Sequence, residues 1–269
     1  MKSIDILNSC KELNAEKAYK KVFSFCTLVT RPEEYAEMVA SARNAGFTED
    51  IAEFYYFDNK KSNTYDAYKG INKAIRDVEG EYLIFCHQDI LFNYDNAHKL
   101  LDILRKLDVD SPNWGVVGNA GKDEFGLAHI RISDPHYEDL RIGNFPANVM
   151  TLDENFLIIN RKQNLGCTTV FRGFHLYGTD LCQNSMKLGL VNFAVDFHLY
   201  HKSPGKVDQS YRDLQTEYIN WQKKIKQADF IWAMCSNFYT SSSKWKNAFF
   251  NLKQILRWAR TVHKRQSRK

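Results

Sequence analysis

The sequence lacks several features that would assign it directly to a common class. No run of about 18 apolar residues occurs, so no segment is expected to span a membrane as a helix. Glycine and proline are sparse, no segment is of low complexity, and no internal repeat is visible. The six cysteines include no CxxC pair and most lie in apolar runs, which predicts reduced, buried thiols in a cytoplasmic protein. The polar first 21 residues predict no secretory signal.

The familiar glycine-rich nucleotide motifs are also absent. No GxGxxG follows the first apolar run, which argues against a Rossmann dinucleotide fold, and no GxxxxGK[ST] exists to form a P-loop. The stretch TLVTRPEEY contains no glycine, although a nucleotidyltransferase would normally carry a glycine-rich loop there. No GxSxG nucleophile elbow occurs either.

Acidic residues are missing from the end of the chain. Lys244 to Lys269 contains nine Lys or Arg and no acid, whereas the remainder has 28 basic and 32 acidic residues, a net charge of −4. Apolar residues recur there at helical spacing, which predicts a basic amphipathic helix from about 242 to 264. Its stripe could pack on the rest of the protein or lie on anionic membrane lipids, and we favour the membrane. The acidic body and the lack of any nucleic-acid motif predict no nucleic-acid partner.

Apolar and amphipathic segments alternate through the first half. Short apolar runs at 22–29, 53–57, 82–86 and 114–118 are typical of buried strands, and helical patterns lie between them at 32–44, 63–78 and 96–107. This alternation predicts an α/β fold with a mostly parallel sheet and helices on both faces. The second half is less regular. We expect loops over 121–150, an edge strand or hairpin over 152–160, a helix over 179–188, a strand over 190–195 and a polar helix over 208–227.

Polar clusters follow three of the predicted strands. They are Thr30-Arg31, Asp58-Asn59 and the pair His87 and Asp89. In parallel sheets ligands bind beyond the carboxyl ends of the strands, so these clusters are expected to meet in one site. His87 and Asp89, one residue apart, could form a polar loop tip or could bind a metal ion.

Six stretches carry a resemblance to a known family. In order they are FCTLVTRPEEY, FYYFDNKKSNTYDAYKGINKAI, EYLIFCHQDI, LDENFLIINRK, FHLYGTDLCQNSMKLGL and FHLYHKS. Together they resemble the family 2 glycosyltransferases of the GT-A fold, in the bacterial branch whose metal corner reads HQD. The resemblance covers about residues 23–206. It implies a GT-A domain at 21–206, an N-terminal extension at 1–20 and a C-terminal helical extension at 207–269.

The resemblance also implies roles for residues around the donor. Thr30 and Arg31 would border the nucleobase and ribose, and Asp58, with Asn59 beside it, would hydrogen-bond the base or ribose. Asp89 would be the metal-binding carboxylate. The usual first Asp of the DXD motif is His87 here, which can ligate the metal directly or orient Asp89. The Asn-x-Gly common after the second strand is replaced by Tyr68-Lys69-Gly70.

Further roles concern the acceptor side and the remaining histidines. Asp180 would be the catalytic base, with an ordinary helix cap as the alternative reading, and His201 would lie near the diphosphate or the metal. Asp153 would face the acceptor, or belong to a plain turn. His198 is a weaker candidate for the diphosphate than His201, and His175 is expected to be structural.

The activity implied is inverting transfer of a sugar from a nucleotide-diphosphate sugar to a hydroxyl acceptor. A divalent Mn²⁺ or Mg²⁺ would neutralise the leaving diphosphate, and a carboxylate would take the acceptor proton. The acceptor would be a glycan or lipid-linked glycan of a bacterial surface polysaccharide such as O-antigen or capsule, on the inner face of the membrane. A non-catalytic nucleotide-sugar-binding module and a nucleotide-sugar hydrolase or pyrophosphorylase remain as alternatives.

Overall fold

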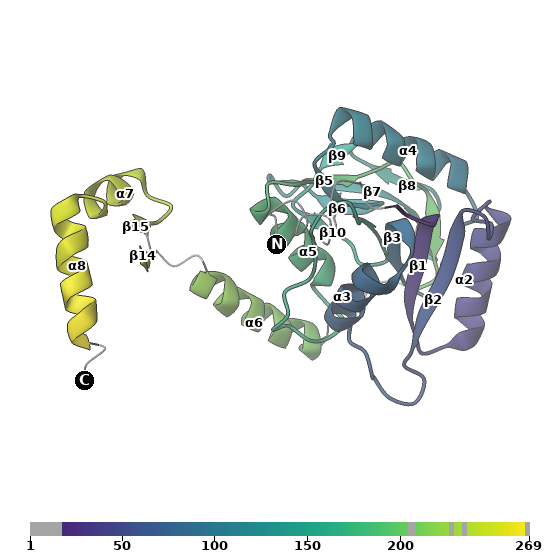
Figure 1. Ribbon diagram of the computed structural model, residues 1–269. Coiled ribbons are helices and arrows are strands. Elements are labelled where there is room, and N and C mark those ends of the chain that lie inside the picture. The colour runs from purple at the N-terminus through teal and green to yellow at the C-terminus, as the bar shows by residue number, and fades with distance from the viewer. Residues whose placement is uncertain (1–17, 204–207, 226–228, 233–235, 267–269) are drawn as a thin grey trace, which may run out of the picture. The chain divides into compact units, whose positions relative to one another are not determined.

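The computed structural model describes residues 18–203, 208–225, 229–232 and 236–266 (Figure 1). The chain divides into two compact units, residues 1–211 and 212–269. Of the predicted N-terminal extension, residues 1–17 lie outside the described residues.

The first unit is built on a seven-stranded sheet. Its strands are, in order, β2 (Ala52–Asp58), β1 (Lys21–Val29), β3 (Gly80–Cys86), β11 (Phe156–Asn160), β5 (Trp114–Gly118), β12 (Val191–Ala194) and β9 (Ala147–Asn148). β1 pairs parallel with β2 and β3, and β12 pairs parallel with β5, whereas β11 and β9 run antiparallel to their neighbours. The predicted α/β class is therefore confirmed, and it is consistent with the glycosyltransferase fold that the resemblance implies.

Four helices flank this sheet: α2 (Pro32–Asn44), α3 (Ala67–Asp77), α4 (Ala97–Asp110) and α5 (Tyr177–Lys187). α3 begins later than predicted because the Asp66 side chain accepts a hydrogen bond from the Lys69 amide and so caps the helix there. Asn96 caps α4 in the same way, through the Lys99 amide.

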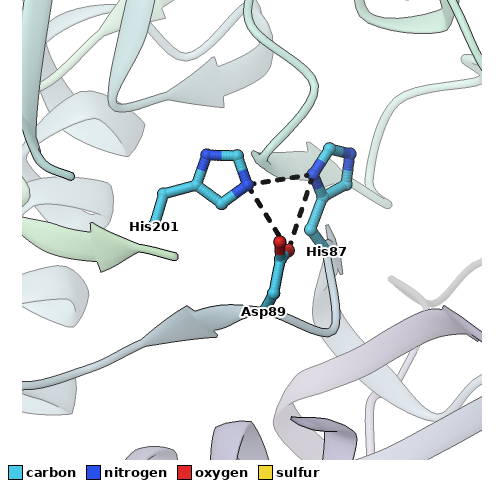
Figure 2. Close-up of side chains that lie close together, drawn as sticks. All are labelled: His87, Asp89 and His201. Atoms are coloured by element: carbon cyan, nitrogen blue, oxygen red, sulfur yellow. Dashed lines mark hydrogen bonds and ion pairs between the residues drawn. The ribbon is translucent and has the colours of Figure 1, made fainter. Parts of the chain in front are cut away.

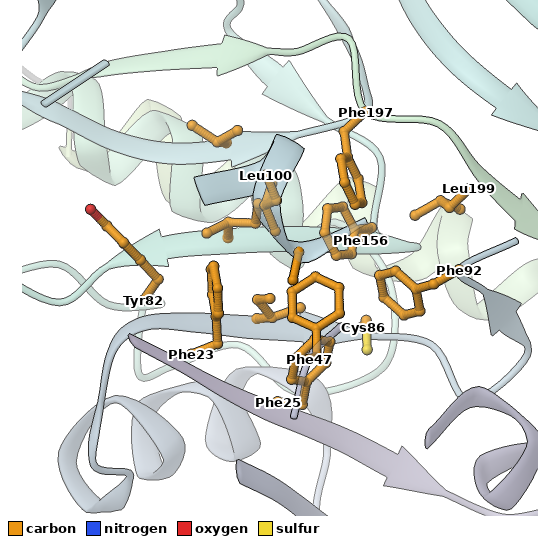
Figure 3. Packing of buried hydrophobic residues seen from close by; sticks show 14 of the residues in the cluster. Phe23, Phe25, Phe47, Tyr82, Cys86, Phe92, Leu100, Phe156, Phe197 and Leu199 are labelled. Carbon is orange, nitrogen blue, oxygen red and sulfur yellow. The ribbon is translucent and has the colours of Figure 1, made fainter. Parts of the chain in front are cut away.

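Aromatic side chains fill the core between the sheet and the helices α2 and α4 (Figure 3). Phe23 and Phe25, two residues apart on β1, point to the same face of the sheet and both contact Phe47, with ring centroids 5.3 and 5.0 Å apart. Residues of the alternate register, such as Phe85, face α5 instead, where Phe85 meets Tyr177 at 5.8 Å. Burial of both faces holds the strand ends in fixed positions.

The strand β11 corrects one expectation. The segment 152–160 was predicted to be an edge strand or hairpin, but residues 156–160 form a central strand between β3 and β5. All five residues are buried, and Ile158 pairs with both Ile84 and Val117. An unbroken apolar run is the pattern of a strand buried on both faces, and that signal outweighs the turn residues before it.

A second sheet replaces much of the loop predicted over 121–150. Its path is β10 (Thr151–Leu152), β6 (Ala120–Lys122), β7 (Ala128–Ser133), β13 (Leu199–His201) and β4 (Ile90–Leu91), with β8 (Leu140–Ile142) paired to β7. These strands are short and half-exposed, so their sequences lack the apolar periodicity that would reveal them.

The second unit contains a hairpin as well as helices. α6 (Gln209–Ile225) is followed by the antiparallel pair β14 (Asp229–Trp232) and β15 (Asn237–Thr240), then α7 (Lys244–Phe250) and α8 (Lys253–Gln266). The single helix predicted over 242–264 is thus interrupted. The Asn251 side chain donates to the carbonyls of Tyr239 and Asn247 and accepts from the Tyr239 amide, which ties the break to β15.

Two general expectations can be compared with the described residues. No helix among them is both long and apolar enough to cross a membrane. Cys26, Cys86, Cys167 and Cys182 are buried free thiols, as predicted, whereas Cys10 and Cys235 lie outside the described residues.

Candidate metal and nucleotide site

Two histidines and one aspartate converge at the end of β3 (Figure 2). His201 Nε2 lies 3.4 Å from Asp89 Oδ1 and 3.4 Å from His87 Nδ1, and His87 Nδ1 lies 4.0 Å from Asp89 Oδ1. One ligand atom from each residue lies within 4.8 Å of the others. This is the only such group of three or more potential metal ligands among the described residues.

The strand pairing explains why these three residues meet. His87 and Asp89 follow β3 directly, and β4 begins at the next residue, Ile90. β4 pairs antiparallel with β13, which places His201 opposite Ile90 and therefore beside Asp89. The Lys202 amide donates to the Asp89 carbonyl at 3.0 Å and fixes this register.

The charge states of the cluster suit metal binding. Burial would raise the pKa of the Asp89 carboxyl, but hydrogen bonds from His201 and Ser203 outweigh it and hold that pKa below its usual range. Burial, followed by the positive charge of neighbouring His201, lowers the pKa of His87. Asp89 is therefore ionised and His87 neutral at neutral pH, which are the forms that ligate metals.

Tyr177 sets the orientation of the His87 ring. Its hydroxyl donates to the Glu154 carbonyl at 3.1 Å, and His87 Nε2 lies 3.1 Å from the same hydroxyl. Because the hydroxyl proton is already donated, the hydroxyl accepts from Nε2–H. The Nδ1 lone pair of His87 is then directed toward Asp89 and His201, as is usual when a group behind a histidine orients it for a metal.

Gln88, between the two candidate ligands, anchors the loop after β1. Its Oε1 accepts from the amides of Thr30 and Arg31, both at 2.9 Å, and its Nε2 donates to Thr30 Oγ1 at 3.0 Å. The side chain is only 8% exposed. No role was predicted for Gln88 from the sequence. Its position inside HQD was the only feature of the sequence that could have indicated one.

A pocket of about 270 Å³ adjoins the metal cluster. Its lining brings together residues that follow three strands of the sheet, namely Thr30, Arg31, Asn59, His87, Gln88 and Asp89. Phe174, Tyr177 and Ser203 also line it, and none of these was a predicted site residue. Polar residues that follow β1, β2 and β3 therefore lie around one pocket, as the strand pattern predicted.

The predicted nucleotide-binding residues differ in how they are held. The exposed Arg31 guanidinium lies 3.9 Å from Asp89 Oδ2 and also pairs with Glu34 at 2.9 Å. Asp58 is exposed, outside the pocket lining, and pairs with Lys60 at 3.3 Å. Asn59 is buried and closes the following loop through two hydrogen bonds with the Tyr65 backbone.

Asp180 lies in a different environment from the metal cluster. It is completely buried, with Oδ1 accepting from Thr168 Oγ1 and Oδ2 from the Thr168 amide, both at 2.7 Å. Asn184 donates a further bond to Oδ2 at 3.3 Å. Burial raises the pKa of Asp180, and the Thr168 bonds oppose that rise. These hydrogen bonds connect the loop that contains Thr168 to α5.

The remaining predicted residues are placed as follows. Asp153 is exposed and bonds the Asn155 amide through Oδ1 at 3.0 Å. His198 stacks on Tyr94 at 3.8 Å and contacts Ser133 Oγ at 2.8 Å, outside the metal cluster. His175 contacts Tyr211 and Asp208 rather than the cluster.

Comparisons with known proteins give one substantial relative. The chain is 34% identical over 213 residues to "ATP synthase subunits region ORF 6" of Fuscovulum blasticum, which covers 74% of this chain and 84% of that protein. No protein-family profile matches. Among solved structures, S. aureus TarS is similar with a TM-score of 0.46 at 11% identity, over 74% of this chain and 43% of TarS. A197 from STIV has a TM-score of 0.39 at 10% identity, over 70% of this chain and 86% of that one. These two structural similarities are too weak to indicate a reaction.

Proposed function

This chain belongs to the family of the Fuscovulum blasticum protein "ATP synthase subunits region ORF 6", and we propose that it is an inverting glycosyltransferase. It would move a sugar from a nucleotide-diphosphate sugar to a hydroxyl acceptor. The relative's name specifies no reaction, so the proposal depends on the site. The observation that carries it is the cluster of His87, Asp89 and His201, of which His87 and Asp89 line a pocket formed by the strand ends.

The residues that line the pocket support binding of a nucleotide diphosphate. Thr30 and Arg31 would border the nucleobase and ribose on a loop that Gln88 holds in place, and Asn59 lines the same pocket. Asp58 would reach the base or ribose from its exposed position beside the pocket. The Arg31 guanidinium, close to Asp89, offers a positive charge to a diphosphate.

His87, Asp89 and His201 would hold one divalent cation, because one ligand atom from each lies within 4.8 Å of the others and because Asp89 and His87 are in ligating forms. When bound, such an ion would neutralise the charge of the leaving diphosphate. Mg²⁺ prefers oxygen ligands, whereas divalent transition metals, Mn²⁺ included, bind imidazole more readily than Mg²⁺ does. Two imidazoles beside one carboxylate therefore favour Mn²⁺ over Mg²⁺ in this site.

The second unit offers a surface for an anionic membrane. Trp245, Phe249 and Trp258 are 84%, 56% and 64% exposed. Five basic side chains of α7 and α8 are exposed and form no ion pair within the described part of the chain: Lys244, Lys246, Lys253, Arg257 and Arg260. Exposed aromatic and basic side chains on an amphipathic helix are typical of binding to anionic lipid. These side chains support our proposal that the protein acts at the cytoplasmic face of a membrane, on a glycan or lipid-linked glycan of a bacterial surface polysaccharide.

Product analysis tests the proposed reaction. The purified chain is incubated with UDP-, GDP- and dTDP-sugars, with Mn²⁺, Mg²⁺ or EDTA, in the presence of membrane lipid extract as acceptor. Release of nucleoside diphosphate coupled to a glycosylated lipid supports transfer. Release of free sugar or of sugar phosphate without acceptor indicates hydrolysis, and formation of a nucleoside triphosphate when pyrophosphate is added indicates pyrophosphorolysis. Binding of the donor without turnover in any condition leaves only a nucleotide-sugar-binding module.

A further inference from the structure

The turn between β10 and β11 carries two adjacent carboxylates, Asp153 and Glu154, next to the metal cluster. The His87 amide donates to the Asn155 carbonyl at 2.9 Å, so this turn is hydrogen-bonded to the segment that supplies two of the candidate ligands. The Tyr177 hydroxyl contacts both the Glu154 carbonyl and His87 Nε2. Glu154 is therefore linked to the metal cluster through one side chain.

Backbone amides at the start of α5 hold the half-buried Glu154 carboxylate. Oε1 accepts from the Gly178 amide at 3.3 Å, and the Tyr177 amide also stabilises the carboxylate. A Cβ at Gly178 would lie 2.6 Å from the Leu152 carbonyl oxygen and 3.2 Å from Glu154 Cγ, so the glycine permits this approach. The side chain is thus oriented by the backbone and retains a lone pair that can receive a proton.

The other two candidate carboxylates are less suitable as a base. Both oxygens of Asp180 are occupied by Thr168, and the residue has no exposed surface, so an acceptor hydroxyl cannot reach it without rearrangement. Asp153 is exposed, and its Oδ1 already accepts from the Asn155 amide at 3.0 Å. Burial, followed by the negative charge of Asp153, raises the pKa of Glu154 to about 8, near that of an effective base at neutral pH.

We propose that Glu154 is the general base of the transfer reaction, which rests on the glycosyltransferase function proposed above. Glu154 Oε2 would take the proton of the acceptor hydroxyl. The acceptor oxygen then forms its bond to the anomeric carbon as the bond from that carbon to the diphosphate oxygen breaks. The nucleoside diphosphate leaves with the electron pair, and the proton remains on Glu154.

The substitution Glu154→Gln separates this role from a structural one. A Gln side chain can still accept the Gly178 amide bond through Oε1, so the start of α5 keeps its contact, but it cannot accept a proton from the substrate. We expect kcat to fall by about 100-fold or more, with KM for the donor and the thermal midpoint nearly unchanged. Wild-type turnover should rise with pH and level off above about 8, because the ionised carboxylate is the active form, whereas the residual rate of the variant should lose this rise.

Asp180→Asn and Asp153→Asn serve as comparisons under the same conditions. We expect Asp180→Asn to lower the thermal midpoint but to retain most turnover in the folded fraction. Transfer by Glu154→Gln at the wild-type rate, with wild-type protein active, overturns the role of Glu154 alone. Loss of turnover in Asp180→Asn without loss of stability assigns the proton to Asp180 instead. A wild-type chain that transfers no sugar from any donor overturns both this role and the proposed function.

Discussion

Gln88 offers the sharpest test of how the fold holds the pocket. Its amide makes three hydrogen bonds of 2.9, 2.9 and 3.0 Å to Thr30 and Arg31, and the side chain is 8% exposed. Gln88→Leu has a similar volume but removes all three bonds. It also leaves two backbone amides without their acceptor.

The magnitude follows from those contacts. Hydrogen bonds of this kind contribute about 0.5–1.5 kcal/mol each, so the variant should lose about 2–4 kcal/mol of unfolding free energy. For a chain of this size 1 kcal/mol shifts the midpoint by about 2–4 °C, so we expect a fall of about 4–16 °C. If the loop detaches and water satisfies its amides, the fall will be smaller, and nucleotide affinity will drop because the loop must be ordered again on binding.

Differential scanning calorimetry and nucleotide titration together measure both outcomes. Gln163→Leu is a matched control, because Gln163 donates a single bond, to the Pro112 carbonyl at 3.2 Å. We expect that control to cost less than about 1 kcal/mol and to leave nucleotide binding unchanged. If Gln88→Leu matches the control in both measurements, Gln88 does not organise the loop and the argument from its contacts is wrong.

Three further predictions concern the metal, α5 and the second unit. Asp89→Asn should abolish the EDTA-sensitive part of nucleotide binding seen by calorimetry; equal affinity with and without EDTA in the wild type would remove the metal from the proposal. Asp180→Asn should lower stability by about 1–3 kcal/mol in chemical denaturation, since one of the two oxygens that accept from Thr168 becomes a nitrogen, which cannot accept; an unchanged midpoint would show that the pair is not needed for the fold. The full chain should sediment with liposomes containing anionic lipid but not with neutral ones, and less so at high salt. A chain ending at Ser241 should remain in the supernatant, and if it instead melts far lower while the full chain ignores anionic liposomes, the helices are structural.

Local sequence patterns were sufficient for the first half of the fold. Strands at 21–29, 80–86 and 114–118 were predictable because each is a short apolar run bounded by turn residues, and such runs are stable only when buried. The meeting of Thr30, Arg31, Asn59 and Asp89 around one pocket followed from the same pattern, since the carboxyl ends of parallel strands share one edge.

Only the tertiary structure decided the rest of the site. The family resemblance implied that His201 lies near the diphosphate or the metal, but its place beside Asp89 depends on the pairing of two very short strands, β4 and β13, which no periodicity in the sequence reveals. The burial and the hydrogen-bond partners of Asp180 also depend on tertiary packing. A Gly-Thr-Asp at the start of a helix suits a buried cap as well as a catalytic base, and the approach of Thr168 from a distant loop occupies both oxygens. Residue types and spacing determined which groups could act, whereas long-range pairing determined which of them are accessible and have a partner within reach.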